Sequence, residues 1–113
     1  MYKIGEFSKL TGCSIKTLRY YGELGILNPS RIDNFTNYRY YDENDLEVLK
    51  TIIYLKSLGF TLEEIKNNIN NITKELLDSK IKELLNKKYI IEEQINNLSL
   101  FKDKLNNKVK VLK

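Results

Sequence analysis

The stretch SIKTLRYYGELG, residues 14–25, places Arg19, Tyr20 and Tyr21 next to one another, a combination that suits contact with nucleic acid. An arginine binds phosphates or the edge of guanine, and a tyrosine can donate its hydroxyl to a phosphate. Helical periodicity puts Tyr21 on the apolar side with Leu18, so we predict that Tyr21 is buried and that Tyr20 lies exposed beside Arg19. An alternative is that both tyrosines only cover neighbouring structure. Composition alone does not distinguish this alternative from contact with nucleic acid.

The stretch YRYY, residues 38–41, repeats the mixture of tyrosine and arginine. In a strand, Tyr38 and Tyr40 would face one way and Arg39 and Tyr41 the other. One pair should pack and the other should face outward, but alternation does not decide which. An outward arginine with a tyrosine suits contact with a minor groove or a phosphate backbone.

Catalysis finds little support in this chain of 113 residues, which has no histidine and a single cysteine, Cys13. Neither a Gly-rich phosphate loop nor spaced metal ligands occur. Cys13 is expected to be a small buried residue in a tight turn. The acidic cluster at 42–47 suits the start of a helix better than a metal site. We therefore expect no enzyme activity, no metal and no cofactor.

The charge is unevenly distributed along the chain, whose net charge is +4. Residues 1–41 carry six basic residues (Lys or Arg) and three acidic ones. Residues 42–71 carry three basic and six acidic residues, and residues 72–113 carry ten basic and six acidic residues. A basic N-terminal segment is compatible with nucleic acid, although lysine-rich surfaces are often only solvated. No apolar run approaches the ~18 residues of a membrane span, and no signal peptide opens the chain. With one cysteine, no internal disulfide is possible, and we expect a cytoplasmic protein.

Two short helices must position Arg19 and Tyr20. Apolar periodicity predicts the first helix from about residue 4, with Gly12 just after its end. Ser14 is a typical cap for the second helix, which Gly25 ends. Helices joined by so short a turn predict a helix-turn-helix over about 4–24.

A β-hairpin, or wing, is predicted at about 29–41, where SRI and YRYY flank the turn-forming DNFTN. Asn37 can adopt the left-handed backbone that such a turn needs. A capped helix follows, from Asp42 to Gly59, and then a shorter helix that begins with a capping box at Thr61.

The last part of the chain carries a heptad pattern. Nine of the eleven heptad positions from Leu77 to Leu112 are apolar, and the exceptions are Lys88 and Lys102. This pattern predicts a long coiled-coil helix that needs a partner. The alternative, packing against its own N-terminal segment, would leave much of so long a helix uncovered. The residues that we expect to contact this partner are Ile81, Leu84, Ile91, Ile95, Leu98 and Leu105.

The segments IGEFSKLTGCSIKTLRYYGELGIL and NYRYYDENDLEVLKTIIYLKSLGFTLEEIK closely resemble the MerR family of bacterial transcription regulators. The match runs from Tyr2 to about Asn71, its ordered motifs TLRYY, YRYY and LGFTLEEI are highly specific, and NFTNYRYY looks most like the drug-sensing branch. The resemblance implies a mainly α fold. Residues 1–71 would form a winged helix-turn-helix and a helix pair, and residues 72–113 a linker and an antiparallel coiled-coil dimerisation helix.

The resemblance also implies a function. Family members bind a pseudo-palindromic promoter site in double-stranded DNA as homodimers, distort it, and so alter its use by RNA polymerase, which is indirect readout. The positions that match the family's DNA contacts are Ser14, Lys16, Thr17, Arg19, Tyr20, Tyr38, Arg39, Tyr41 and Lys56.

Departures from the family pattern leave alternatives open. Gly22 replaces an acidic residue and should cost up to about 1 kcal/mol of helix stability. The C-terminal cysteines of the metal- and redox-sensing members are missing, which does not support such sensing. VKVLK either begins a further domain or is the last heptad.

Two other functions compete with the regulator. One is a protein-interaction module that pairs with a different chain, and the other is an architectural protein that bends DNA without controlling a promoter.

Overall fold

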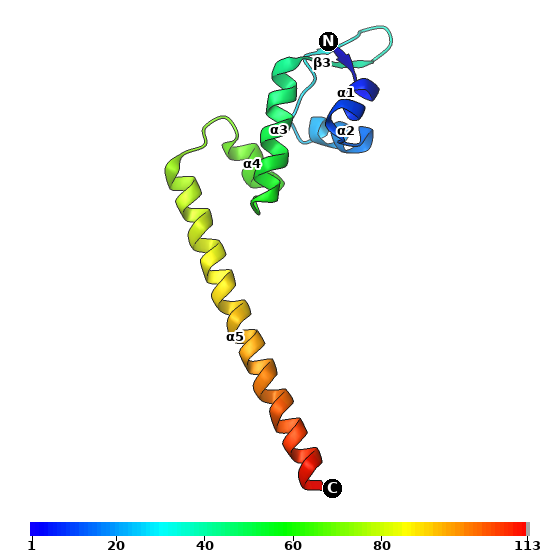
Figure 1. Cartoon of the computed structure of the whole chain (residues 1–113). Coiled ribbons are helices and arrows are strands. Elements are labelled where there is room, and N and C mark those ends of the chain that lie inside the picture. Colours follow the sequence, from blue (N-terminus) through cyan, green and yellow to red (C-terminus); the bar gives the residue numbers. More distant parts are fainter. Residues whose placement is uncertain (113) are drawn as a thin grey trace. The chain divides into compact units, whose positions relative to one another are not determined.

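The computed structural model describes the backbone of residues 1–112 and the side chains of residues 1–108. The chain divides into two compact units (Figure 1), of which the N-terminal unit is Met1–Asn71 and the second begins at Ile72. The N-terminal unit contains a small sheet and four helices, and the second unit contains one long helix. The fold is thus mainly helical, as predicted.

Two short helices, α1 (Ile4–Thr11) and α2 (Ile15–Glu23), form the predicted helix-turn-helix. Gly12 ends α1 in the left-handed conformation, with φ of 76°. Ser14 caps α2, because its hydroxyl oxygen accepts a hydrogen bond from the Thr17 amide at 3.1 Å. Gly12 and Ser14 therefore play the parts that were predicted for them at the turn.

A three-stranded antiparallel sheet forms the wing. Its strands are β1 (Tyr2–Lys3), β2 (Arg31–Ile32) and β3 (Arg39–Tyr41), in the order β1-β3-β2. Tyr2 lies opposite Tyr41, and Arg31 lies opposite Tyr40. The hairpin of β2 and β3 was predicted, whereas β1 was not, because two residues are too few to show alternation. Pairing with β1 makes β3 the central strand.

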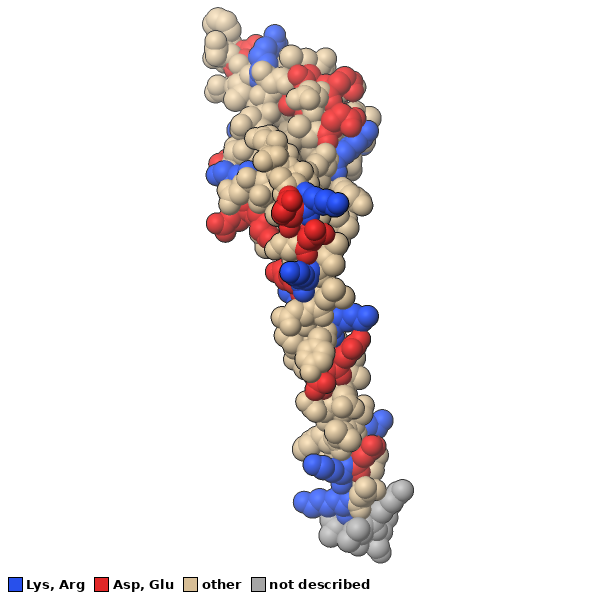
Figure 2. All heavy atoms as spheres, turned by 90° about the vertical axis from the view of Figure 1, so that its left-hand side faces the viewer, with Lys and Arg blue, Asp and Glu red and all other residues tan. Residues whose placement is uncertain are grey.

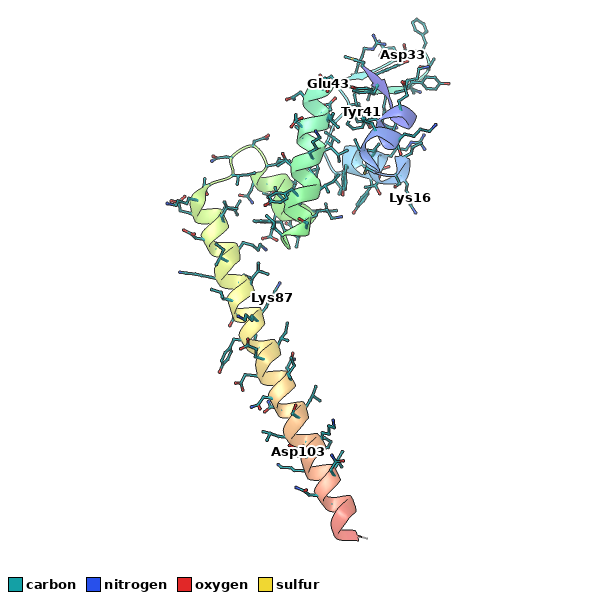
Figure 3. All side chains as sticks on the ribbon, in the orientation of Figure 1. Lys16, Asp33, Tyr41, Glu43, Lys87 and Asp103 are labelled. Carbon is teal, nitrogen blue, oxygen red and sulfur yellow. The ribbon has the colours of Figure 1, made fainter. Side chains whose placement is uncertain are left out.

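The loop between β2 and β3 is held by its own hydrogen bonds. The Asp33 carboxylate accepts from the amides of Phe35 at 2.9 Å and Thr36 at 3.0 Å. Both bonds lower the pKa of the Asp33 carboxyl, and the bond from the Thr36 amide has the larger effect. Asn37 adopts the predicted left-handed conformation, with φ of 59°. The loop, at the end of the wing that carries Asp33 in Figure 3, thereby presents Phe35 with 98% of its surface exposed.

Helix α3 (Glu43–Ser57) begins with a capping box, as predicted. The Asp42 carboxylate accepts from the Asp45 amide at 2.8 Å, and the Asp45 carboxylate accepts from the Asp42 amide at 2.9 Å. Asp45 is buried and also accepts from the Ser30 hydroxyl at 2.6 Å. The hydrogen bond from the Asp45 amide lowers the pKa of the Asp42 carboxyl.

Helix α4 (Leu62–Asn68) follows α3 after Gly59, whose φ is 95°. Its predicted capping box is present, because the Thr61 amide donates to the Glu64 carboxylate at 2.9 Å and the Glu64 amide donates to the Thr61 hydroxyl at 3.1 Å. Both helices therefore begin where short-range sequence signals indicated.

The core of the N-terminal unit is built around two stacked rings. Phe7 of α1 and Tyr41 of β3 lie with ring centroids 4.5 Å apart and planes within 3°. Leu10 and Ile53 are exposed, although Leu10 follows the buried Phe7 by three residues and Ile53 follows the buried Leu49 by four. Periodicity marks a face but does not show how far a neighbouring element covers it. The buried apolar residues are Phe7, Leu18, Tyr21, Ile26, Leu27, Tyr41, Leu49, Ile52, Leu55, Phe60 and Ile65.

Helix α5 (Lys74–Leu112) has 39 residues, a length of about 58 Å at 1.5 Å per residue. Lys88, at a heptad position, lies 4.0 Å from the Glu92 carboxylate one turn further on. Figure 2 shows uncharged surface between the Lys and acidic residues along this helix. The heptad side chains of Val109 and Leu112 lie outside the described side chains.

Gly22→Ala should raise the free energy of unfolding by about 0.5–1 kcal/mol, because alanine is the better helix former. A Cβ at Gly22 would lie 3.7 Å from the Leu27 carbonyl oxygen, an ordinary contact. Gly25→Ala is the matched control and should lower stability, because Gly25 has φ of 73°. Urea unfolding at one fixed protein concentration measures both. A loss of stability in Gly22→Ala would contradict the unstrained contact that the structure gives a Cβ at that position.

Candidate nucleic-acid interface

Helix α2 separates its two tyrosines as predicted. Tyr21 is 3% exposed and lies in the core, whereas Tyr20 is 48% exposed. Lys16 and Arg19 are exposed on the same helix, and Lys16 points away from the rest of the N-terminal unit in Figure 3. Helix α2 therefore presents two cations and a phenol to a partner from a rigid backbone.

Ser14 and Thr17, the other predicted contacts on this helix, belong to its cap. The Ser14 hydroxyl accepts from the Thr17 amide and donates to the Thr17 hydroxyl at 2.8 Å. The Thr17 hydroxyl keeps its own proton, which it can donate to a phosphate. The two side chains can thus contact DNA while they hold the start of α2.

The wing exposes Tyr38 and leaves Arg39 half-buried. Beside them, the Arg31 guanidinium lies over the Tyr40 ring, 4.7 Å from its centroid. Such a cation–π contact orients the arginine along the sheet. The wing therefore adds a further cation, Arg31, that the sequence analysis did not select.

Tyr41 does not reach the surface, so its expected role as a DNA contact is wrong. Its side chain is 0% exposed because α1 covers this end of β3 and Phe7 stacks on the ring. Burial raises the pKa of the Tyr41 hydroxyl, which has no hydrogen-bond partner among the described residues. Figure 3 shows Tyr41 within the N-terminal unit, between its helices.

Lys56 lies at the end of α3, beside the helix-turn-helix. Its ammonium group donates to the Tyr21 hydroxyl at 3.5 Å. Its charge also acts on the half-buried thiol of Cys13, whose pKa burial raises and Lys56 lowers to a smaller extent. Lys56 is exposed, so the structure brings this predicted contact close to α2, the candidate recognition helix.

A groove of about 510 Å³ lies between α2 and the wing, and α1 lines it with Ile4, Gly5, Glu6 and Lys9. Its lining includes Arg19 from α2 and Tyr38 and Arg39 from the wing, so the two predicted sets of contacts meet there. Lys3 and Lys9 also line the groove, and sequence analysis missed both. The only signal for them was the positive charge of residues 1–41, which does not distinguish one lysine from another.

Within the part of the chain that the structure describes, no group of three or more His, Cys, Asp or Glu residues could hold a metal ion. No helix among those described has the length and apolar character needed to cross a bilayer.

The family model of the MerR HTH family regulatory protein matches residues 2–72. The HTH-type transcriptional activator Mta of Bacillus subtilis (strain 168) is 34% identical over 100 residues, which cover 86% of this chain and 38% of Mta. This chain thus spans less than half the length of Mta. The crystal structure of the Mta N-terminus superimposes with a TM-score of 0.81 at 33% identity, covering 88% of this chain and 95% of that one.

Two further solved structures contain DNA. The cryo-EM structure of the EcmrR–DNA complex in its RNA polymerase open complex matches with a TM-score of 0.75 and 32% identity, over 96% of this chain and 40% of EcmrR. HiNmlR, a regulator that lacks the sensor domain, was solved bound to promoter DNA. It matches with a TM-score of 0.56 and 25% identity, over 96% of this chain and 86% of HiNmlR.

Tyr41→Phe should leave DNA affinity unchanged and keep or raise the free energy of unfolding. The ring stack with Phe7 is kept, and a buried hydroxyl without a partner, which costs about 1–3 kcal/mol, is removed. Tyr38→Phe, on the exposed part of the wing, is the matched control for DNA affinity and should weaken binding if its hydroxyl meets a phosphate. A fall in DNA affinity for Tyr41→Phe alone would restore the original expectation.

Proposed function

Because this chain belongs to the MerR family of DNA-binding helix-turn-helix transcriptional regulators, we propose that it binds a pseudo-palindromic promoter site as a homodimer and distorts the DNA. The observation that carries the proposal is the joint presence of two surfaces. One is the exposed Lys16, Arg19 and Tyr20 of α2 beside the wing. The other is an apolar stripe on α5 that needs a partner.

Helix α2 would enter the major groove, with the wing at the adjacent minor groove. Arg19 can meet a guanine edge or a phosphate, whereas Lys16 and Tyr20 suit phosphates. Ser14 and Thr17 would bind the backbone from the helix start. The contacts proposed outside α2 are Tyr38 and Arg39 in the wing and Lys56 at the end of α3.

The stripe on α5 supports dimerisation. Ile81, Leu84, Ile91, Ile95, Leu98 and Leu105 are all exposed in the single chain. So many apolar side chains on one isolated helix favour pairing with another helix. Pairing with a second copy in antiparallel orientation gives a twofold axis near the middle of the stripe. A twofold protein matches a site with twofold symmetry, which is why we propose a pseudo-palindrome.

The proposed output acts at RNA polymerase. EcmrR was solved with DNA in an RNA polymerase open complex, and HiNmlR bound to promoter DNA. Their likeness to this chain supports promoter DNA and the polymerase as its partners. Distortion would act through deformation energy, which a protein can use at positions that it does not touch.

Arg19→Ala should weaken binding to the promoter region upstream of the protein's own gene and reduce its preference over an unrelated duplex. A lost bidentate contact to guanine corresponds to about 1–3 kcal/mol of discrimination in each half-site. Titrations at two salt concentrations, with bent-DNA mobility, measure affinity, phosphate contacts and bending together. Lys50→Ala is the control, because Lys50 is exposed on α3 and paired with Glu47.

Equal binding of the wild-type protein to every duplex, without a bend, would refute the regulator. A bend at a selected site that does not change transcription from the promoter would favour the architectural alternative. Absence of any salt-dependent DNA affinity, together with pairing to another chain, would favour the interaction module.

Ile91→Asp should convert the dimer to a monomer and weaken DNA binding. Ile91 lies near the middle of the stripe, so the twofold axis would bring both aspartates close to one another in the apolar interface, where burying unpaired charges is costly. Asn86→Asp is the matched control, because heptad numbering places Asn86 opposite the stripe. Light scattering after size-exclusion chromatography gives the mass of each variant. A wild-type monomer, or an Ile91→Asp dimer, would exclude this interface.

A further inference from the structure

We propose that the groove between α2 and the wing holds one sugar-phosphate strand of the bound duplex, with Lys3 and Lys9 on its phosphates and Glu6 opposing it. This inference rests on the proposed function, because it assumes that α2 and the wing both contact DNA. It adds three residues that neither the sequence motifs nor the family likeness selected.

The groove has the chemistry of a backbone site. Four cations line it, Lys3, Lys9, Arg19 and Arg39, together with a single acidic residue, Glu6. Ile4 and Ile15 supply apolar lining, and the exposed ring of Tyr38 lies at the wing side. A deoxyribose presents apolar carbon atoms between charged phosphates. The lining therefore matches both parts of a DNA strand.

The geometry of the duplex supports the same occupant. In B-form DNA one sugar-phosphate strand separates the major groove from the adjacent minor groove. A protein that places a helix in the first and a wing at the second must straddle that strand. The surface between α2 and the wing is this groove, so the strand and the groove face one another.

Glu6 stands in the groove for a reason within the fold. Its carboxylate accepts from the Lys3 amide at 3.1 Å and so caps the start of α1. A glutamine at this position can accept the same hydrogen bond. Glu6→Gln therefore removes a negative charge from the groove and keeps the helix cap.

The test compares Lys3→Gln, Lys9→Gln and Glu6→Gln on two duplexes of about 30 base pairs, long enough for two half-sites. One duplex is the promoter region upstream of the protein's own gene, and the other is unrelated in sequence. Both subunits of the dimer carry the substitution, so each lysine variant should lose two phosphate contacts per complex. It should bind about thirtyfold more weakly at about 0.15 M salt, with a salt slope smaller by about two. Glu6→Gln should bind up to about thirtyfold more tightly for the same reason.

The effects should be alike on both duplexes, because phosphates carry no sequence information. Lys50→Gln, an exposed lysine outside the groove, should change neither affinity nor slope. Circular dichroism checks that every variant keeps the helical content of the wild type, and the gain expected for Glu6→Gln cannot arise from a folding defect.

Unchanged affinity in Lys9→Gln and Glu6→Gln, with binding still weakened by Arg19→Ala, would overturn the groove assignment and leave the proposed function standing. If no variant, Arg19→Ala included, bound DNA more weakly than the wild type, both the groove assignment and the proposed function would be overturned. The same would follow if the wild type did not bind DNA. If Lys9→Gln kept DNA affinity but lost recruitment of RNA polymerase to the bound promoter, the occupant would be a protein and the assignment to DNA would be wrong.

Discussion

The stack of Phe7 on Tyr41 joins the two parts of the candidate DNA-binding surface. Phe7 comes from α1 and Tyr41 from β3, and both rings are fully buried with their centroids 4.5 Å apart. An aromatic pair of this kind contributes about 0.5–1.5 kcal/mol beyond the burial of its area. Its larger effect is geometric. Because α1 holds α2 through a tight turn, the stack fixes the separation between the recognition helix and the wing.

Helix α3 supports both the wing and α2, through one hydrogen bond near each of its ends. Near its start, Asp45 accepts from Ser30 just before the wing, and near its end Lys56 donates to Tyr21 of the recognition helix. The buried Asp45 carboxylate is also satisfied by the Asp42 amide, which offsets the cost of taking it out of water. The wing and the recognition helix are therefore both tied to one helix.

Features that depend on neighbouring residues were predictable from the sequence, and features that depend on distant ones were not. Residues within one or two helical turns determine the caps at Ser14, Asp42 and Thr61. They also determine that Tyr20 is exposed and Tyr21 is buried. The burial of Tyr41 depends on Phe7, far away in the chain, so alternation in YRYY could not assign its inner face.

Some residues of the candidate site could likewise be predicted from the sequence, and others could not. Residues on α2 and in the wing carry a motif, whereas Lys3 and Lys9 are ordinary lysines until folding brings them to the groove. The short strand β1, which places Lys3 there, has no signal of its own because its pairing partner comes much later in the sequence.

The strand order β1-β3-β2 has a consequence for the route by which the chain folds. Strands β2 and β3 are joined by a short loop, so the hairpin can form locally. Pairing of Tyr2 with Tyr41 instead closes a loop of about 40 residues, and each doubling of loop length adds about 0.6 kcal/mol of entropic cost. We expect the edge formed by β1 to assemble last, once α1 and α2 have shortened the span between its ends, and to be the first part of the sheet to open.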